Sequence, residues 1–462
     1  MLFLPYKMLV TVYITNYNYA AFIAQSIDSV LNQTLQHFEL LIIDDGSTDN
    51  SKEIIENYRN NPKIHIIYQQ NKGLNITNNI AMRMARGKYI MRLDADDCLL
   101  PNALEKMSAV LEKEDSLGLV FPDYYYIDKD GNITGEEKRH DFDTEVSLYD
   151  QPAHGACTMI RLAFLKELGG YNESFTCQDG YDLWIKFIIH YKVTNINESL
   201  FYYRRHRNNL TTNEEKILST RKKIKEAFVN EKFNTPSTIA IIPVRDTFIG
   251  NVNLPLYEIY GKTIIERKVK ECLKSDKLKY IVISTSSIEI KNYCENKFQN
   301  MPRVLIVERP LDYAEQHVSL NQTILQTIAL LQQKNVSVQA IMTVSIEYPF
   351  LKYDVIDEAI NTLVLFKSDA VLSVRPDTRS YYQHTGHSLQ PILGQEKFTR
   401  LEREALYEAA GGIALSTVEN ILKNNRVISG KISHVVVDEQ AAMEVNSKLG
   451  LIILRAFKEL MF

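Results

Sequence analysis

Carboxylates gather at two places in the first half of this chain, each directly after an apolar run. Asp44 and Asp45 follow LLII, and Asp94, Asp96 and Asp97 follow YIMRL. Grouped carboxylates repel one another unless a cation or hydrogen-bond donors compensate them. Mg²⁺ or Mn²⁺ takes one or two carboxylates together with phosphate oxygens. Residues of these types could hold a divalent cation together with phosphate oxygens, or they could be turn-forming and helix-capping aspartates, and the acids alone do not decide between the two.

The segments around these acids alternate between strand and helix patterns. Buried strands are predicted at MLVTVYITNYN, FELLIIDDGSTD, KIHIIYQQN and GKYIMRLDADD. Helical spacing separates them at residues 20–34, 51–61 and 75–86. Repeated strand–helix units predict an α/β domain with a largely parallel sheet. Ligands of such sheets bind beyond the carboxyl ends of the strands, which is where the polar residues stand.

The same pattern restarts in the second half of the chain. A charged helical stretch is followed by FNTPST, and STIAIIPVRD, TIIERKVKECLKS and KYIVISTSS then read as strand, helix and strand. We therefore predict two α/β domains in tandem, each with a mostly parallel sheet flanked by helices; the resemblances given below imply that both have nucleotide-binding folds. Their ranges are 1–212 and 237–462, joined by a helical linker at 213–236.

Composition excludes several other classes of protein. The 462 residues are 45% hydrophobic and carry a formal charge of −4, which argues against a disordered chain and against nucleic acid as a partner. Five cysteines form no CxxC pair, and no apolar run reaches the length of a membrane span. We expect a cytoplasmic protein. Its last sixteen residues either pack on their own domain or contact the inner face of the membrane as an amphipathic helix.

The order of the motifs carries a resemblance. NYN, DDGSTD, NKG, ARGKYIMRLDADD, GGYNESFTCQDGYDLW and YYRRH follow one another in this order. Over about residues 8–215 the chain resembles family 2 of the inverting glycosyltransferases, which have a glycosyltransferase A-type fold. The resemblance implies a metal-dependent enzyme that uses Mn²⁺ or Mg²⁺ and a nucleotide-diphosphate sugar. It also implies a saccharide or lipid-linked acceptor in the synthesis of a surface polysaccharide, capsule or lipopolysaccharide.

The resemblance also assigns roles to individual residues. Thr15, Asn16 and Asn18 line the nucleotide, Asp44 contacts the base with Asp45 beside it, Asp94 lies near the ribose, Asp96 binds the metal, Asp179 is the general base, and His206 lies near the metal and diphosphate. A carboxylate is needed because inverting transfer is one displacement in which the acceptor hydroxyl loses its proton. The alternatives are a turn residue at Asp179 and a surface histidine at His206.

Two positions depart from the family pattern. Asn78 stands where the family often has an arginine that meets the phosphates, and Gln178 stands where it often has a glutamate. A neutral amide gives up one contact between charges. Lys72 or the cluster Arg204–Arg207 is a candidate to replace it.

The second half resembles the cytidylyltransferases that make CMP-activated acid sugars, over about residues 237–460. Of the phosphate loop after the first strand only Arg245 and Gly250 remain, because Asp246 to Ile249 replace its glycines, serine and lysine. Arg309 in VERP and Glu444 complete the residual site. The family holds its metal with two carboxylates, and here only that of Glu444 remains.

These are losses of chemistry rather than of scaffold. Phe248 and Ile249 are apolar and cannot neutralise the charge of a triphosphate, and Asp246 would repel it at close range. We therefore expect a second domain that kept its fold without nucleotidyl transfer. It would form a homodimer contact, dock a pathway partner or bind a sugar without activating it, and we favour the homodimer contact. The alternative is a bifunctional enzyme whose second domain also makes a CMP-sugar from CTP.

Overall fold

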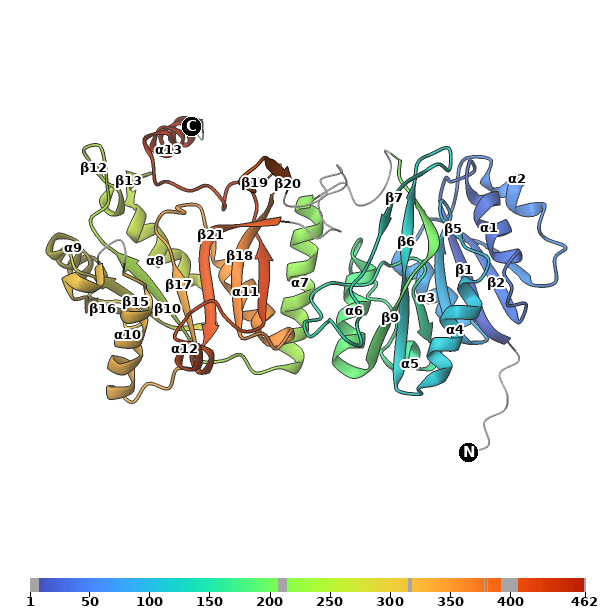
Figure 1. The fold of residues 1–462 in the computed structure, drawn as a ribbon, viewed down its shortest axis with the longest axis horizontal. Helices are drawn as coiled ribbons and strands as arrows, with labels where there is room; N and C mark the ends of the chain where they lie inside the picture. Colours follow the sequence, from blue (N-terminus) through green and yellow to red (C-terminus); the bar gives the residue numbers. More distant parts are fainter. Residues whose placement is uncertain are drawn as a thin grey trace. The chain divides into compact units, whose positions relative to one another are not determined.

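The computed structural model describes residues 8–206, 214–314, 318–377, 379, 381–391 and 406–460. It divides into two compact units, residues 1–221 and 222–462, which are described separately (Figure 1). Both units are α/β, which confirms the predicted fold class.

The first unit alternates strands and helices up to its fourth strand, as expected. Its elements are β1 (Met8–Asn16), α1 (Ile23–Leu31), β2 (Phe38–Asp44), α2 (Ser51–Glu56), β3 (Ile64–Tyr68), α3 (Leu74–Met84), β4 (Gly87–Asp94), β5 (Cys98–Leu99), α4 (Ala103–Lys113), β6 (Leu117–Ile127), β7 (Ile133–Glu137), β8 (Met159–Arg161), α5 (Leu162–Glu167), α6 (Asp179–His190) and β9 (Lys192–Arg204).

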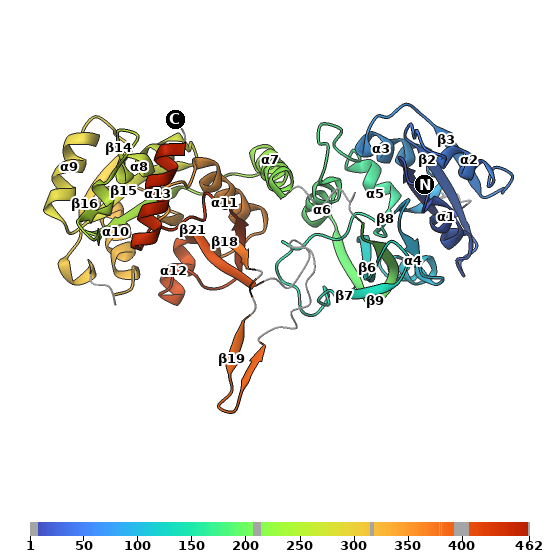
Figure 2. The same cartoon turned by 90° about the horizontal axis from the view of Figure 1, so that it is seen from above.

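One sheet holds these strands in the order β3-β2-β1-β4-β8-β6-β9-β5, with β7 paired to β6. The four strands β1 to β4 run parallel, whereas β8 is antiparallel to both of its neighbours. Side chains alternate between the faces of a strand. Val12 and Met91 point into a core shared with α1 and α4. Tyr13 and Arg92 therefore face the opposite side of the sheet, which α3, α5 and α6 cover (Figure 2).

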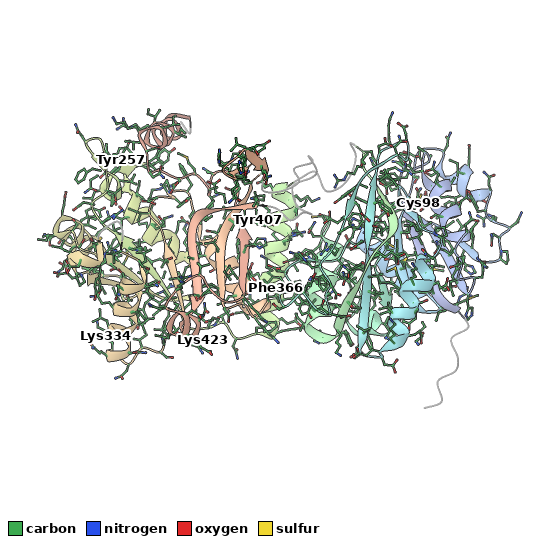
Figure 3. The ribbon with its side chains drawn as sticks, viewed as in Figure 1. Cys98, Tyr257, Lys334, Phe366, Tyr407 and Lys423 are labelled. Carbon is green, nitrogen blue, oxygen red and sulfur yellow. The ribbon has the colours of Figure 1, made fainter. Side chains whose placement is uncertain are left out.

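The lengths of the first helices follow from local chemistry. α1 buries Ile23, Ile27 and Val30 along one face, at helical spacing. α2 begins after Asp49, whose carboxylate accepts from the N–H of Ser51 at 3.0 Å, and it ends at Glu56, before the predicted limit of residue 61. Turns replace its last predicted residues. Cys98, labelled in Figure 3, opens the short β5, which pairs with the last strand.

The second unit repeats the pattern with more short strands. Its elements are β10 (Thr238–Val244), β11 (Phe248–Ile249), β12 (Val252–Asn253), the 3₁₀ helix η2 (Leu254–Leu256), β13 (Glu258–Ile259), β14 (Lys262–Thr263), α8 (Ile264–Lys274), β15 (Leu278–Thr285), α9 (Ile288–Phe298), β16 (Val304–Glu308), η3 (Leu311–Ala314), α10 (Asn321–Gln333), β17 (Ala340–Val344), α11 (Tyr353–Leu365), β18 (Ala370–Asp377), β19 (Tyr382–His384), β20 (Leu389–Pro391), β21 (Leu406–Thr417), α12 (Val418–Asn424), β22 (Ile432–Val436) and α13 (Lys448–Leu460).

Its main sheet has the order β16-β15-β10-β17-β21-β18-β22, in which β21 is antiparallel to both neighbours. Helices α8, α9, α11 and α13 pack on one face, and α10 and α12 pack on the other. Thr263 caps α8, because its hydroxyl accepts from the N–H of Glu266 at 3.2 Å. The hairpin β19–β20 projects from the main sheet of this unit (Figure 2).

Helix α7 (Glu214–Lys232) contains the division between the units at residues 221 and 222. The predicted linker at 213–236 stays a prediction, and residue 213 lies outside the described chain. Helix α13 buries Leu451 and Leu454 in the core of the second unit and leaves Leu449 and Ile452 exposed. Among the helices that the structure describes, none combines the length and the apolarity needed to cross a bilayer.

Candidate active site

Three parallel strands bring the polar residues of the first unit to one edge of its sheet. In the strand register Asn16 lies opposite Asp44, and Thr15 lies opposite Asp94. Thr15, Asn16, Asp44 and Asp94 therefore share one level of the sheet, although up to 79 positions of the printed sequence separate them.

The loop after β1 is tied to the loop after β2. Asn16 donates from Nδ2 to Asp44 Oδ2 at 2.7 Å, and the N–H of Ser47 donates to Asp44 Oδ1 at 2.9 Å. Asn18 has a positive φ of 62° and accepts from the N–H of Thr48 at 2.7 Å. Asn16 Oδ1 is buried without a protein partner among the described residues. These hydrogen bonds hold the two loops against each other.

Asp45 performs a different task from Asp44. Its Oδ1 accepts from Gln69 Nε2 at 2.7 Å and from the N–H of Lys72 at 2.8 Å, and its Oδ2 accepts from the N–H of Gly73 at 2.9 Å. The side chain is 6% exposed. It fixes the loop that begins α3 and has few lone pairs left for a ligand.

The aspartates after β4 form a tight acidic cluster with His206. Asp96 Oδ2 lies 2.8 Å from His206 Nε2. Burial and then the charge of Asp94 raise the pKa of Asp96, while the contact with His206 lowers it. Burial also raises the pKa of Asp97, which accepts from the N–H of Arg204 at 2.9 Å. This crowding of acids is what a bound cation would relieve.

His206 is held in the interior rather than at the surface. Its side chain is 13% exposed, and its ring stacks on Phe22 and meets Tyr19 edge-on, with both centroid distances 5.7 Å. Packing of this kind fixes the ring beside the Asp96 carboxylate. The geometry does not match a surface histidine.

The residues present fit a divalent cation that takes further ligands from its substrate. In the described part of the chain no group of three or more His, Cys, Asp or Glu side chains is placed to hold a metal. Asp96 and His206 offer one carboxylate and one imidazole at contact distance. Mg²⁺ is commonly held by one or two carboxylates plus substrate phosphates, and Mn²⁺ accepts both donor types.

Asp179 begins α6 and lies on the face of the sheet opposite the α1 core. Its side chain is 11% exposed, and its Oδ2 accepts from Arg92 Nη1 and, at 3.4 Å, from Asn78 Nδ2. Tyr13 donates to Asn78 Oδ1 at 3.2 Å. Asp179 is a fixed residue at a helix start and not a loose turn.

Arg204, one of the candidates to replace the missing phosphate arginine, is unsuited to that role. Arg204 is 2% exposed, and its guanidinium donates to the backbone oxygens of Asp96, Asp128 and Lys129 and to Gln25. Its charge supports the acidic cluster from inside the protein. The guanidinium of Arg205 lies over the ring of Tyr126, 3.6 Å from the centroid. Arg207 lies outside the described residues.

Sequence reasoning missed Arg92, which contacts the site from within β4. A strand places residues i and i+2 on the same face, so the pair Arg92 and Asp94 was the available signal. The spacing of residues in the sequence could not predict that Asp179 lies beside Arg92 and Asp94. Its position depends on how the start of α6 packs against β4.

In the second unit, Arg245 lies near Arg309, and Glu444 lies near Glu347. Arg245 donates to the backbone oxygen of Ala314 at 3.2 Å, and Arg309, 4% exposed, donates to that of Val244 at 3.1 Å. Burial and the charge of Arg245 lower the pKa of Arg309. Burial and then the charge of Glu444 raise the pKa of Glu347.

The altered phosphate loop of this unit is a small hairpin. Gly250 turns it with a φ of 63°, and Phe248 is 65% exposed on its first strand. Asp246 accepts from Asn253 Nδ2 at 2.9 Å and from Ser287 Oγ at 3.0 Å. The hairpin presents a carboxylate and an aromatic ring where a phosphate cradle needs N–H groups and a cation.

Comparison with known proteins supplies independent findings. The family model described as glycosyl transferase family 2 matches residues 11–169, and the one described as cytidylyltransferase matches residues 239–371. Asp179 and His206 lie beyond the first match. An uncharacterized glycosyltransferase of Methanocaldococcus jannaschii, MJ1057, is 36% identical over 207 residues, 43% of this chain and 71% of that protein.

A second relative is much longer than the matched region. Chondroitin synthase of Escherichia coli is 35% identical over 179 residues, 38% of this chain and 26% of that enzyme, so this chain spans about a quarter of its length. The crystal structure of TarS 1-349 from S. aureus is 18% identical with a TM-score of 0.40, covering 49% of this chain and 67% of that one.

Proposed function

Because this chain belongs to glycosyl transferase family 2, we propose that its first unit is a metal-dependent, inverting transferase. It moves a sugar from a nucleoside diphosphate donor to an acceptor hydroxyl. The observation that carries the proposal is the junction at one sheet edge of the Asp96–His206 pair with Asp94, Arg92 and Asp179.

The donor lies along the strand ends. Thr15, Asn16 and Asn18 line the nucleotide, Asp44 receives the base, and Asp94 receives the ribose. Asp45 acts indirectly, because its oxygens already hold the loop before α3. The Oδ1 of Asn16, which has no hydrogen-bond partner in the part of the chain that the structure describes, is available to a donor group of the nucleotide.

The chemical step is a single displacement. The acceptor oxygen attacks the anomeric carbon, its proton passes to Asp179, and the bond to the diphosphate breaks. Asp96 and His206 would hold Mn²⁺ or Mg²⁺. A bound cation would offset the charge that develops on the leaving diphosphate.

A relative supports our proposal for the product class. Chondroitin synthase is named for a polysaccharide, and it is 35% identical to this chain over 179 residues. We place the first unit in the synthesis of a surface polysaccharide, with a saccharide or lipid-linked acceptor.

A donor panel with metal control tests this function. The full chain is incubated with UDP-, GDP- and dTDP-sugars and Mn²⁺, and release of nucleoside diphosphate is measured. We expect release from one nucleotide class, its loss in EDTA and its return with Mn²⁺ or Mg²⁺. Release that is unchanged by EDTA would refute metal dependence, and absence of release and of nucleotide binding across the panel would refute the function.

For the second unit we propose a scaffold that contributes a homodimer contact and no nucleotidyl transfer. The match to the cytidylyltransferase model favours the bifunctional alternative, whereas the hairpin with Asp246 and Phe248 supports the scaffold. Calorimetry with CTP and Mg²⁺ separates them. We expect no binding heat, and saturable heat together with release of pyrophosphate on addition of an acid sugar would establish the alternative.

A further inference from the structure

Arg92 connects the two sides of the proposed active site. It stands two residues before Asp94 on β4, and its Nε lies 2.9 Å from Asp94 Oδ1. Its Nη1 donates to Asp179 Oδ2 at the start of α6. One guanidinium thus contacts the residue proposed for the ribose and the residue proposed as the base.

The surroundings of Arg92 are shaped to its side chain. A Cβ atom added to Gly155 would lie 2.6 Å from Arg92 Nη2 and 3.3 Å from Cζ. A Cβ added to Gly180 would lie 3.2 Å from the Cα of Gly155. The N–H of Cys157 donates to the backbone oxygen of Arg92 at 2.8 Å. Glycine at 155 therefore leaves the space that the guanidinium fills.

The positive charge of Arg92 lies beside the buried carboxylate of Asp179. A buried carboxylate is stabilised by a cationic partner, and Arg92 supplies one to Asp179. Both side-chain donors to Asp179, Arg92 Nη1 and Asn78 Nδ2, reach Oδ2. Within the described chain, Oδ1 is left for an acceptor hydroxyl.

We infer that Arg92 is a positioning residue that fixes the Asp179 carboxylate relative to Asp94 and directs its Oδ1 toward the acceptor. The inference rests on the proposed roles of Asp94 and Asp179. Arg92 acts through these carboxylates and is distinct from the residues that touch the donor. Its effect falls on the turnover step more than on donor affinity.

Geometry distinguishes arginine from lysine at this position. The planar fork of a guanidinium spans two carboxylates, whereas an ammonium is a point charge that reaches one of them well. A lysine therefore restores the charge without the bridge. Gly155→Ala also keeps the charge, but it disturbs the bridge by displacing the guanidinium itself.

The test compares three variants with a matched control. Arg92→Met, Arg92→Lys and Gly155→Ala are made in the full chain, and the control is Arg86→Lys, which alters an arginine paired with the buried Glu39 at the other end of β4. Turnover is followed as release of nucleoside diphosphate from the best donor of the panel. Affinity for UDP, GDP or dTDP with Mn²⁺ is measured by calorimetry.

We expect kcat to fall about 100-fold in Arg92→Met and about 10-fold in Arg92→Lys and Gly155→Ala, since misplacing a catalytic group by about 1 Å costs roughly that much. Donor KM and nucleotide affinity should change less than about twofold. Arg86→Lys should match the wild type. If Arg92→Met fails to fold, the other two variants carry the test.

Three results would overturn the inference in different ways. A wild-type chain with neither release nor nucleotide binding removes the proposed function and this inference together. An active wild type whose folded Arg92→Lys and Gly155→Ala variants keep full kcat removes the inference alone. Equal losses in nucleotide affinity and in kcat would assign Arg92 to donor binding instead.

Discussion

The two units treat charge at their sheet edges in opposite ways. In the first, His206, Arg92 and backbone N–H groups, including that of Arg204, meet the carboxylates of six aspartates: Asp44, Asp45, Asp94, Asp96, Asp97 and Asp179. In the second, Arg245 and Arg309 stand near each other and bind backbone oxygens, while Glu347 faces Glu444.

This difference in charged residues shows that the residues that stabilise the fold are not those that form the site. Each unit buries a continuous apolar core across a sheet and its helices. That core supplies most of the favourable free energy of folding and depends little on the residues at the strand ends. A site can therefore be lost while the scaffold stays.

The largest expected effect comes from removing the proposed base. Asp179→Asn keeps the size and the contact with Arg92 but cannot accept a proton, so kcat should fall about 1,000-fold. The rate of nucleoside diphosphate release measures it. Glu444→Gln is the control in the second unit, with an expected rate equal to the wild type. A reversed order of the two variants would place the activity in the second unit.

Much of this comparison was predictable from sequence, and the exceptions have physical causes. The apolar runs before Asp44 and Asp94 predict strands, and parallel pairing brings their ends together. By contrast, the position of Asp179 beside Arg92 depends on how the loop at Gly155 packs. The region after residue 117 joins antiparallel strands to the parallel ones, and no local pattern states which strand pairs with which.

Motifs in the sequence could name some of the site residues, but they could not give the direction in which a side chain points. Asp96 and Asp179 were named from motifs, and the structure leaves their roles as predictions while showing both to be buried and partnered. Arg204 was considered for phosphate binding, but its hydrogen bonds to three backbone oxygens commit it to the interior. A run such as YYRRH cannot reveal which of its arginines points inward.

The second prediction concerns the cation. His206→Ala removes the imidazole beside Asp96, so the Mn²⁺ concentration for half-maximal release should rise about 100-fold, by analogy with the loss of groups that support a metal ligand. Titration of activity with Mn²⁺ gives the value. His65→Ala, at a half-exposed histidine paired with Glu39, is the control. An unchanged Mn²⁺ requirement would remove His206 from the metal site.

The third prediction concerns a buried cation in the second unit. Lys268 is 1% exposed and donates from Nζ to the backbone oxygen of Tyr348 at 2.5 Å. Burial lowers its pKa to about 8. Between pH 8 and about 10.5 the unfolded chain binds more protons than the folded one, so the free energy of unfolding should rise with pH by about 3 kcal/mol.

Urea unfolding of the full chain at pH 7.5, 9 and 10 measures this rise, and Lys268→Met should abolish it. The slope with pH is the decisive quantity, because methionine also loses the bond to Tyr348. A variant that keeps the wild-type slope would show that Lys268 is not its source.

The smallest expected effect tests the acidic pair of the second unit. The pKa of Glu347 is raised by burial and by Glu444, so the folded state favours the protonated form. Above that pKa, the negative charge of Glu347 therefore lowers the free energy of unfolding. Well below pH 4.5 the residue is protonated in both states and has no such effect. Glu347→Gln should raise the thermal midpoint by about 2 °C at pH 7 and leave it unchanged near pH 4. Transfer by the first unit should stay at the wild-type rate, and a lower midpoint at pH 7 would mean that the Glu347 charge is compensated by a cation such as Arg245.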